Sequence, residues 1–203
     1  MQQIKNITFD FGGVVLDIDF SATQKAFEDL GVTHFNQYFT QHHVDNLFEQ
    51  FEIGAISPEI FYDEFRKKSN LRLTDLQIEH ALNAMILHFS KERMNWLTEV
   101  GKRYNIYLFS NTNKIHVDAF DKLCRKEIGK PLKSFFIQTW YSYEVGMRKP
   151  YPASFVALLK KEGLHADETL FIDDTIENID GAQLAGLQTI HLIPPKTILD
   201  LNL

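Results

Sequence analysis

The sequence predicts an α/β protein built on a parallel β-sheet, with a helical segment inserted after the first strand. Two observations support this prediction. Short apolar segments alternate with helical patterns along most of the chain, which is typical of βαβ units. Between residues 17 and 89, by contrast, helical patterns follow one another without a convincing strand. We therefore expect a core of residues 1–16 and 90–203 and a separate helical cap of residues 17–89.

Five segments have the length and apolar character of buried strands. They are residues 4–9, 106–109, 135–139, 169–172 and 188–192. Three of them end directly before a polar residue, namely Asp10, Ser110 and Asp173. In an open parallel sheet, ligands bind beyond the carboxyl ends of the strands. These polar residues are therefore the first candidates for a functional site.

Helix boundaries can be predicted from proline, glycine and capping residues. Pro152 and Gly163 mark the expected start and end of one core helix, and Gly186 the end of the next. Within the insertion, Ser57 followed by Pro58 opens one helix, and a capping box at 74–77 opens another. The insertion is thus expected to be all helical.

Composition limits the classes of function. At 203 residues and 23.6 kDa, the chain fits an α/β domain with an insertion. Its net charge of −6, from 27 acidic and 21 basic residues, argues against nucleic acid or an anionic membrane as partner. The first residues lack signal-peptide features, and no apolar run is long enough to cross a bilayer. With one cysteine, Cys124, no internal disulfide is possible, so we expect a cytoplasmic protein.

The polar residues after the strands have complementary chemistry. Asp10, Ser110 and the pair Asp173–Asp174 follow three strands, and Lys149 precedes the fourth. A carboxylate can attack phosphorus, and a hydroxyl or an ammonium can hold phosphate oxygens. Carboxylates also bind Mg²⁺, which offsets the repulsion between an anionic nucleophile and an anionic substrate.

Each of these residues also has an ordinary structural explanation. An aspartate after a strand often forms a turn, and Asp173 and Asp174 could cap a helix. Ser110 could also be a cap, and Lys149 a solvated loop residue. All of these explanations would have to hold together at one sheet edge, so we favour a shared site for a small phosphorylated substrate.

Four segments in order resemble the motifs of the haloacid dehalogenase superfamily. They are Phe-Asp-Phe-Gly-Gly-Val-Val at 9–15, Leu-Phe-Ser-Asn-Thr at 108–112, Arg-Lys-Pro at 148–150, and Phe-Ile-Asp-Asp-Thr-Ile-Glu-Asn at 171–178. The resemblance is strongest to the branch that includes an α-D-glucose-1-phosphate phosphatase and the phosphatase domain of soluble epoxide hydrolases. It implies a Rossmann-like core, a helical cap after the first strand, and phosphatase activity, with a sugar phosphate favoured.

The resemblance also implies residue roles. Asp10 would be the nucleophile, and Lys149 would be catalytic and bind the phosphate. Ser110 and the backbone N–H of Asn111 would also bind the phosphate.

The implied metal is Mg²⁺. Its ligands would be Asp10, the backbone carbonyl of Gly12, and Asp174 with Asp173 beside it.

One position departs from the family pattern. Most phosphatases of the superfamily carry a general acid–base aspartate two residues after the nucleophile, where this sequence has Gly12. Such help is worth about 10²–10⁴-fold in rate. A good leaving group, such as that of a sugar 1-phosphate, would reduce the need for it. Alternatively, Asp17 or Asp19 could replace it, or the protein could bind phosphometabolites without catalysis.

Two further reactions are compatible with parts of the pattern. The dehalogenases of the superfamily also lack the acid, but they do not need Mg²⁺, and the paired Asp173–Asp174 favours phosphoryl transfer. A phosphonatase would need a cap lysine, for which Lys25 is the nearest candidate, although a solvated lysine is the better interpretation. The sequence leaves the physiological substrate and the oligomeric state open.

Overall fold

A computed structural model describes residues 3–203. Its centre is a parallel sheet with the strand order β5-β4-β1-β6-β7. The strands are β1 (Asn6–Phe9), β4 (Asn105–Ser110), β5 (Gln138–Tyr141), β6 (Thr169–Asp173) and β7 (Gln188–His191). The predicted α/β class with a parallel sheet is therefore confirmed. Because β1 lies in the middle of the sheet, its carboxyl end is flanked by those of β4 and β6.

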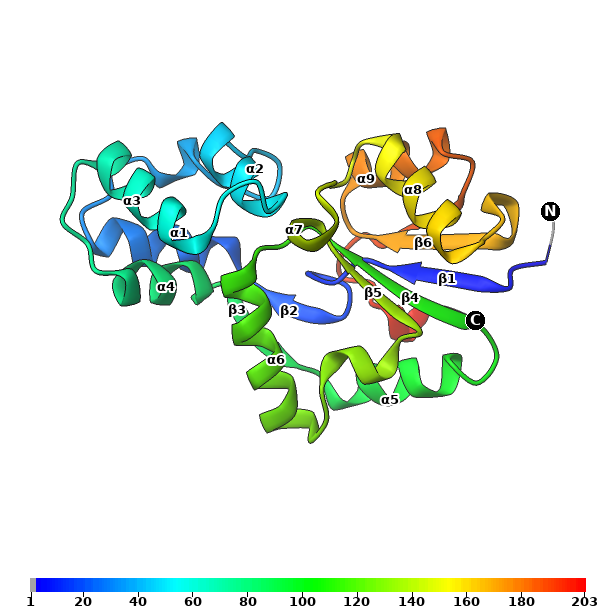
Figure 1. Cartoon of the computed structure of the whole chain (residues 1–203). Coiled ribbons are helices and arrows are strands. Elements are labelled where there is room, and N and C mark those ends of the chain that lie inside the picture. Colours follow the sequence, from blue (N-terminus) through cyan, green and yellow to red (C-terminus); the bar gives the residue numbers. More distant parts are fainter. Residues whose placement is uncertain (1–2) are drawn as a thin grey trace.

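Helices cover both faces of the sheet (Figure 1). They are α5 (Lys91–Val100), α6 (Lys114–Ile128), α8 (Pro152–Glu162) and α9 (Ile176–Leu184). A one-turn helix, α7 (Ser142–Val145), follows β5 at the carboxyl edge (Figure 1), and short 3₁₀ turns lie at Leu132–Phe135, Ala166–Glu168 and Ile198–Asp200. Neighbouring strand residues face opposite layers, as the pleat requires. Leu108 packs in the cluster that includes α5 and α6, whereas Phe109 packs with α8 and α9.

The third strand was predicted about three residues too early, at 135–139 instead of Gln138–Tyr141. Residues Leu132–Phe135 form a 3₁₀ helix after Pro131, and the strand begins at Gln138. Leu132 and Phe136 are buried, so the apolar run reflects packing of a connecting segment. Periodicity alone does not separate a short buried loop from a strand.

The inserted segment forms a second body of helices with its own hydrophobic cluster. It contains α1 (Phe20–Asp29), a 3₁₀ turn (Phe35–Gln37), α2 (Asn46–Glu52), α3 (Pro58–Ser69) and α4 (Asp75–Asn83). We call it the helical body. Phe27, Phe61 and Phe65 are fully buried at its centre. Ser57 caps α3, and Thr74 with Gln77 forms the predicted capping box of α4.

The expectation that residues 17–89 contain no strand was wrong. Strand β2 (Leu16–Ile18) pairs antiparallel with β3 (Ile86–Phe89), so both chain connections to the helical body run side by side. These strands are short, and β3 carries His88 between apolar residues. Such brief segments give too little alternation to be recognised from sequence.

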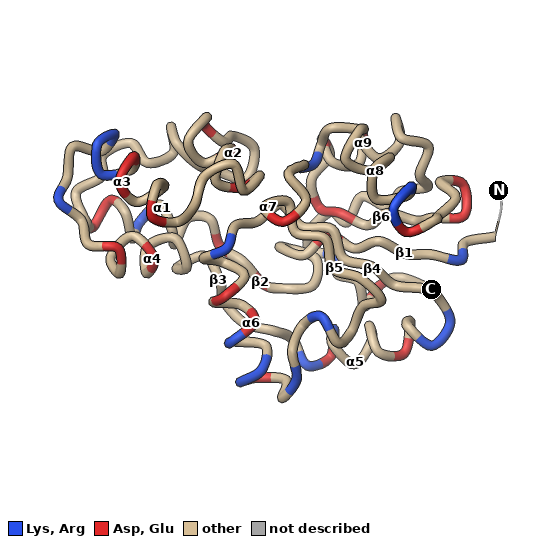
Figure 2. The backbone as a smooth tube through the Cα atoms, in the orientation of Figure 1, with Lys and Arg blue, Asp and Glu red and all other residues tan. Residues whose placement is uncertain are grey.

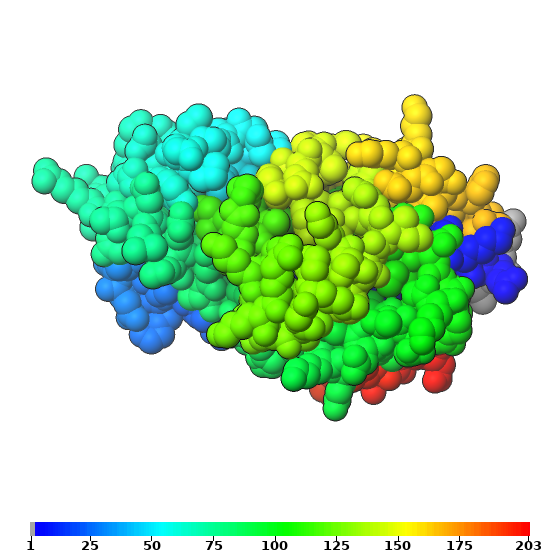
Figure 3. Space-filling view, turned by 60° about the horizontal axis from the view of Figure 1, so that its bottom comes forward, coloured from blue at the N-terminus to red at the C-terminus, as the bar shows by residue number. Residues whose placement is uncertain are grey.

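The helical body packs against the core beyond the sheet. Helix α4 contacts α6, and α2 contacts α7; the space-filling view shows the two bodies as one continuous surface (Figure 3). Buried His116 of α6 lies 3.2 Å from the backbone oxygen of Leu82 in α4 through its Nε2. The carboxyl edge of the sheet is thus covered by the helical body.

The surface carries mixed charge. Lysine and arginine segments lie among aspartate and glutamate segments in both bodies (Figure 2). Among residues 3–203, every helix is too short or too polar to cross a bilayer.

Candidate active site

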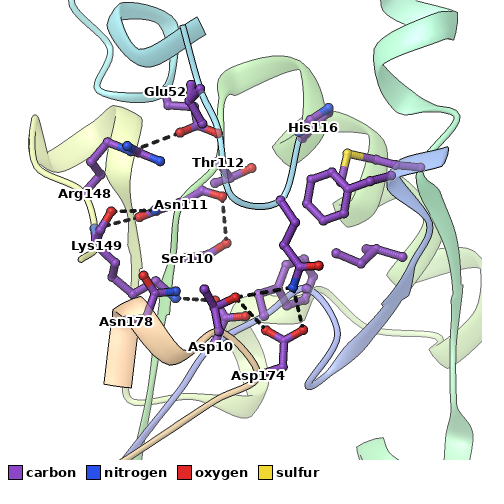
Figure 4. A pocket seen from close by; sticks show the side chains of 18 of the residues that line it. Asp10, Glu52, Ser110, Asn111, Thr112, His116, Arg148, Lys149, Asp174 and Asn178 are labelled. Atoms are coloured by element: carbon purple, nitrogen blue, oxygen red, sulfur yellow. Dashed lines mark hydrogen bonds and ion pairs between the residues drawn. The ribbon is translucent and has the colours of Figure 1, made fainter. Parts of the chain in front are cut away.

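A cavity of about 230 Å³ lies between the carboxyl edge of the sheet and the helical body. Asp10 directly follows β1, Ser110 ends β4, and both line the cavity. Asp174 follows β6 and lines it as well, together with Lys149 (Figure 4). The structure therefore brings the sequence-predicted candidates to one place, from segments up to 164 residues apart (174 − 10).

Lys149 is the cation at the centre of this site. Its side chain is 1% exposed, and its ammonium donates to the carboxylates of Asp10 and Asp173, the latter at 2.8 Å. Asn111 holds the backbone of Lys149 on both sides. Its Nδ2 donates to the Lys149 oxygen, and its Oδ1 accepts from the Lys149 N–H, each at 2.9 Å. This positioning contact of the Asn111 side chain was not expected from the sequence.

Three carboxyl groups gather around that single ammonium. Oxygens of Asp10, Asp173 and Asp174 lie within 4.8 Å of one another. Burial raises the pKa of Asp10 to about 8, and repulsion from the other two carboxylates adds to the rise, while Lys149 opposes it. Burial also raises the pKa of Asp174. Because three carboxyls exceed one ammonium in charge, the donor set fits a hard divalent cation.

The two neighbouring aspartates differ in their free oxygens. Asp173 accepts from Lys149, from the Thr175 backbone N–H at 2.8 Å and from Asn178 at 3.0 and 3.1 Å. It therefore also stabilises the turn into α9, although the N-cap residue of that helix is Thr175. The side-chain carboxylate of Asp174 accepts from the side chains of Thr175 and Gln41. Its carboxylate is the more available of the two for a cation.

Ser110 and its neighbours form a firmly held loop. Ser110 is 4% exposed and lines the cavity. The hydroxyl of Ser142 accepts from the Thr112 N–H at 2.8 Å and donates to the Thr112 oxygen at 2.9 Å. Asn113, rather than Ser110, caps α6. The Ser110 hydroxyl is thus not needed as a helix cap.

Gly12 lines the cavity beside Asp10. A Cβ atom there would lie 2.7 Å from Cδ1 of Ile18, the flexible end of a side chain. No acid replaces it from the expected positions. Asp17 forms ion pairs with Arg93 and His88, and Asp19 caps α1; neither lines the cavity.

Lys25, the candidate for a phosphonatase, also lies elsewhere. It pairs with Asp29 at 2.8 Å on the exposed face of α1. From the aromatic cluster of the helical body, Phe39 reaches the cavity wall, as does Phe20.

The cavity wall includes polar residues that were not predicted as site residues, among them Gln41, Glu52 and Arg148. Gln41 of the helical body donates to Asp174 at 3.2 Å. Glu52 at the end of α2 faces Arg148, whose Nε lies 3.2 Å from its Oε2. The Arg148-Lys149-Pro150 segment signals a site, but nothing in the sequence identifies which residues of the insertion meet it.

The comparisons with known proteins agree with this architecture. Residues 4–186 match the family model of the haloacid dehalogenase-like hydrolases. The chain is 33% identical to the D-ribitol-5-phosphate phosphatase of Bacteroides thetaiotaomicron, over 93% of this chain and 91% of that protein. It is 28% identical to the sesquiterpene phosphatase astK of Aspergillus oryzae, over 93% and 89%.

A solved structure gives the same result. The family enzyme bt-2542 of Bacteroides thetaiotaomicron, an Asp12Ala variant in complex with magnesium and inorganic phosphate, superposes with a TM-score of 0.88. It is 32% identical, and the match covers 93% of each chain. A fold with an aspartate after its first strand and paired acids after a later one thus matches a family of hydrolases. The chain belongs to the haloacid dehalogenase-like hydrolases, as the motif resemblance predicted.

Proposed function

We propose that the chain is a Mg²⁺-dependent phosphatase that hydrolyses a small phosphorylated sugar or polyol through an aspartyl phosphate on Asp10. The observation that carries this proposal is the cluster of Asp10, Asp173 and Asp174 around the buried ammonium of Lys149. The similarity of the chain to a D-ribitol-5-phosphate phosphatase supports a sugar or polyol phosphate as substrate. The magnesium complexes of bt-2542 support Mg²⁺ as the metal.

The metal ligands in this proposal come from two loops. Asp10, Asp174 and the backbone carbonyl of Gly12 would hold Mg²⁺, with Asp173 as a supporting residue because its oxygens already bind Lys149, Thr175 and Asn178. When bound, Mg²⁺ supplies positive charge that offsets the repulsion between the Asp10 carboxylate and a phosphate dianion.

The chain's own residues account for the remaining chemistry. The Asp10 carboxylate attacks phosphorus, and the bond from phosphorus to the ester oxygen breaks, so the leaving group departs with that electron pair. Ser110, Lys149 and the Asn111 N–H bind the phosphoryl oxygens. Water then hydrolyses the acyl phosphate, which releases inorganic phosphate and restores the carboxylate. Because position 12 is glycine, that position supplies no acid, and the leaving oxygen can take its proton from water.

In this proposal the helical body is the cap of the enzyme, comprising residues 17–89. It would exclude bulk water and contact the leaving group, since its residues form the cavity wall opposite the sheet edge. The cytosol is the proposed compartment, in keeping with the single buried Cys124.

Two other functions make distinct predictions. Gly12 favours a protein that binds phosphometabolites without turning them over. A 2-haloacid dehalogenase would also use Asp10. Such an enzyme does not need Mg²⁺, so it would not explain the paired carboxylates of Asp173 and Asp174.

The experiment is a screen of phosphorylated metabolites with and without Mg²⁺, read as phosphate release. We expect Mg²⁺-dependent turnover that falls by about 10³-fold or more in Asp10→Asn and persists in Asp29→Asn, a matched change on the exposed face of α1. Phosphate binding without turnover by the folded protein would support the binding function. Chloride release from 2-haloacids would support the dehalogenase.

A further inference from the structure

Glu52 and Arg148 form an unusual pair at the wall of the cavity. Glu52 is the last residue of α2 and is 6% exposed, and the Arg148 side chain is 15% exposed. The Arg148 Nε lies 3.2 Å from the Glu52 Oε2, close enough for charge attraction. Nevertheless, neither atom has a hydrogen-bond partner of adequate geometry among residues 3–203.

Such an arrangement costs free energy unless something else completes it. A buried polar group without a hydrogen bond costs about 1–3 kcal/mol, and more when it is charged. Burial raises the pKa of Glu52 for the same reason, while Arg148 opposes the rise. Both residues line the cavity, so the missing partner can be a ligand inside it.

The position of the pair indicates which part of a ligand it meets. Figure 4 shows Glu52 and Arg148 at one end of the pocket, and Asp10 and Asp174 at the other. Arg148 directly precedes Lys149, whose backbone is fixed by Asn111. A substrate whose phosphate lies at Asp10 and Lys149 would therefore direct its leaving group towards Glu52.

We propose that Glu52 and Arg148 bind hydroxyl groups of the leaving group and so select polyol or sugar phosphates. This inference rests on the proposed phosphatase function. A hydroxyl donates to the carboxylate and accepts from the guanidinium, and two adjacent hydroxyls satisfy both. A carboxylate on the ligand would be attracted by Arg148 but repelled by Glu52, and an ammonium would be attracted by Glu52 but repelled by Arg148, so neither charge gains from the pair as a whole. An apolar chain would add no hydrogen bond to the Glu52 Oε2 and Arg148 Nε atoms, which lack one within residues 3–203.

The remaining wall is compatible with such a ligand. Phe39, Val44 and Met85 line the cavity alongside the charged pair. Apolar side chains of this kind can pack against the C–H groups of a polyol, while a few polar groups set its orientation. Specificity thus depends on the two charged residues rather than on the apolar area.

The test compares two substrates of one enzyme. The quantity is the ratio of kcat/KM for ribitol 5-phosphate to that for p-nitrophenyl phosphate, whose leaving group lacks aliphatic hydroxyls. We expect Glu52→Leu and Arg148→Met each to lower the ratio by about 10- to 100-fold, the value of charge-assisted hydrogen bonds. Glu64→Leu is the matched control, because Glu64 pairs with Lys67 on the exposed face of α3 and does not line the cavity. Its ratio should change less than about twofold.

A binding experiment separates this inference from the phosphatase proposal. The affinity of ribitol 5-phosphate is measured by calorimetry with Mg²⁺ in the Asp10→Asn background, where no turnover is needed. We expect Glu52→Leu to weaken binding by about tenfold or more; Glu52→Gln serves if the leucine variant does not fold. Equal affinities, or equal losses for both substrates in the kinetic experiment, would overturn the role of Glu52 and Arg148. If wild-type protein turned over neither phosphate, the proposed function would fail instead.

Discussion

The two ends of the cavity are built in opposite ways. At the sheet end, the acidic groups already have partners: Asp10 and Asp173 bind Lys149, and Asp174 binds Thr175. At the far end, the facing atoms of Glu52 and Arg148 lack hydrogen bonds within the described chain. The sheet end is therefore preorganised for the phosphate group, which every substrate shares. At the far end, hydrogen bonds to these atoms of Glu52 and Arg148 are still missing among residues 3–203.

This difference follows from where the residues come from. The sheet end is formed by loops directly after neighbouring strands, whose positions are fixed by backbone pairing. The far end joins Glu52 of the helical body to Arg148 of the core. Its geometry depends on how two hydrophobic clusters dock. We infer that substitutions at the sheet end strongly impair phosphate binding and hydrolysis. Substitutions where the helical body meets the core can instead change which leaving group is selected.

The largest expected effect comes from breaking the sheet end with Lys149→Met. This change leaves Asp10 and Asp173 buried without their cation. We expect kcat/KM to fall by about 10³-fold and the free energy of unfolding without Mg²⁺ to fall by about 3–5 kcal/mol. Phosphate release and urea denaturation measure these quantities.

Lys160→Met provides the control for that variant, because Lys160 is an exposed lysine on α8. It should remain within about 0.5 kcal/mol of wild type. If Lys149→Met kept activity within tenfold, the sheet end would not depend on its internal cation, and the contrast between the two ends would be lost.

A smaller effect is expected where the two bodies meet. Gly54 follows α2 with φ of 68°, and a Cβ there would lie 2.1 Å from the backbone oxygen of Tyr143 in α7. Gly54→Ala combines left-handed backbone strain of about 1–2 kcal/mol with overpacking of about 1–3 kcal/mol. We expect a total loss of about 2–5 kcal/mol in urea denaturation, together with a higher KM for ribitol 5-phosphate because nearby Glu52 is displaced.

Gly163→Ala is the control that separates the effect of the Gly54–Tyr143 contact from the effect of backbone strain. Gly163 has almost the same φ, 67°, but nothing lies within 4 Å of its added Cβ. It should lose only the strain of about 1–2 kcal/mol, with KM unaffected. Equal losses in the two variants would show that the approach of Gly54 to Tyr143 does not hold the bodies together.

The same contrast explains what the sequence could predict. Asp10, Ser110 and Asp173 each end an apolar strand, so a local pattern and the rules of parallel sheets suffice to bring them to one edge. The strand at Gln138–Tyr141 was predicted about three residues early, because the burial of Phe136 in a loop resembles that of a strand.

Residues contributed by the helical body could not be predicted. Gln41 and Glu52 belong to segments without a distinctive motif, and each meets the core through tertiary docking. Helical periodicity shows that Phe48 and Phe51 lie inside the helical body, but it does not show where α2 ends relative to Arg148. A side chain that acts only after docking leaves no local signal in a single sequence.

The smallest expected effect concerns a second contact between the bodies, at His116. Its Nε2 lies 3.2 Å from the Leu82 oxygen and its Nδ1 3.2 Å from the Asn113 amide nitrogen, so the ring is held neutral with its proton on Nε2. Burial lowers the pKa of His116 from 6.5 to about 4. A histidine whose folded pKa is depressed contributes full stability above its unfolded pKa and loses it as the pH falls towards the folded value. We expect a loss of about 1–3 kcal/mol from this group between pH 7 and pH 4.

Urea denaturation of wild type and His116→Gln at pH 7, 6 and 5 isolates this contribution, because other groups that titrate are common to both proteins. The glutamine variant lacks a hydrogen bond worth about 1 kcal/mol at pH 7, and its disadvantage should shrink as the pH falls, because it has no ring to protonate. His80→Gln, at an exposed position on α4, should parallel wild type throughout. A constant difference between wild type and His116→Gln would mean that the ring accepts its proton without disturbing the contact of α4 with α6. In that case the docking of the helical body, and with it the far end of the cavity, would not respond to pH through this residue.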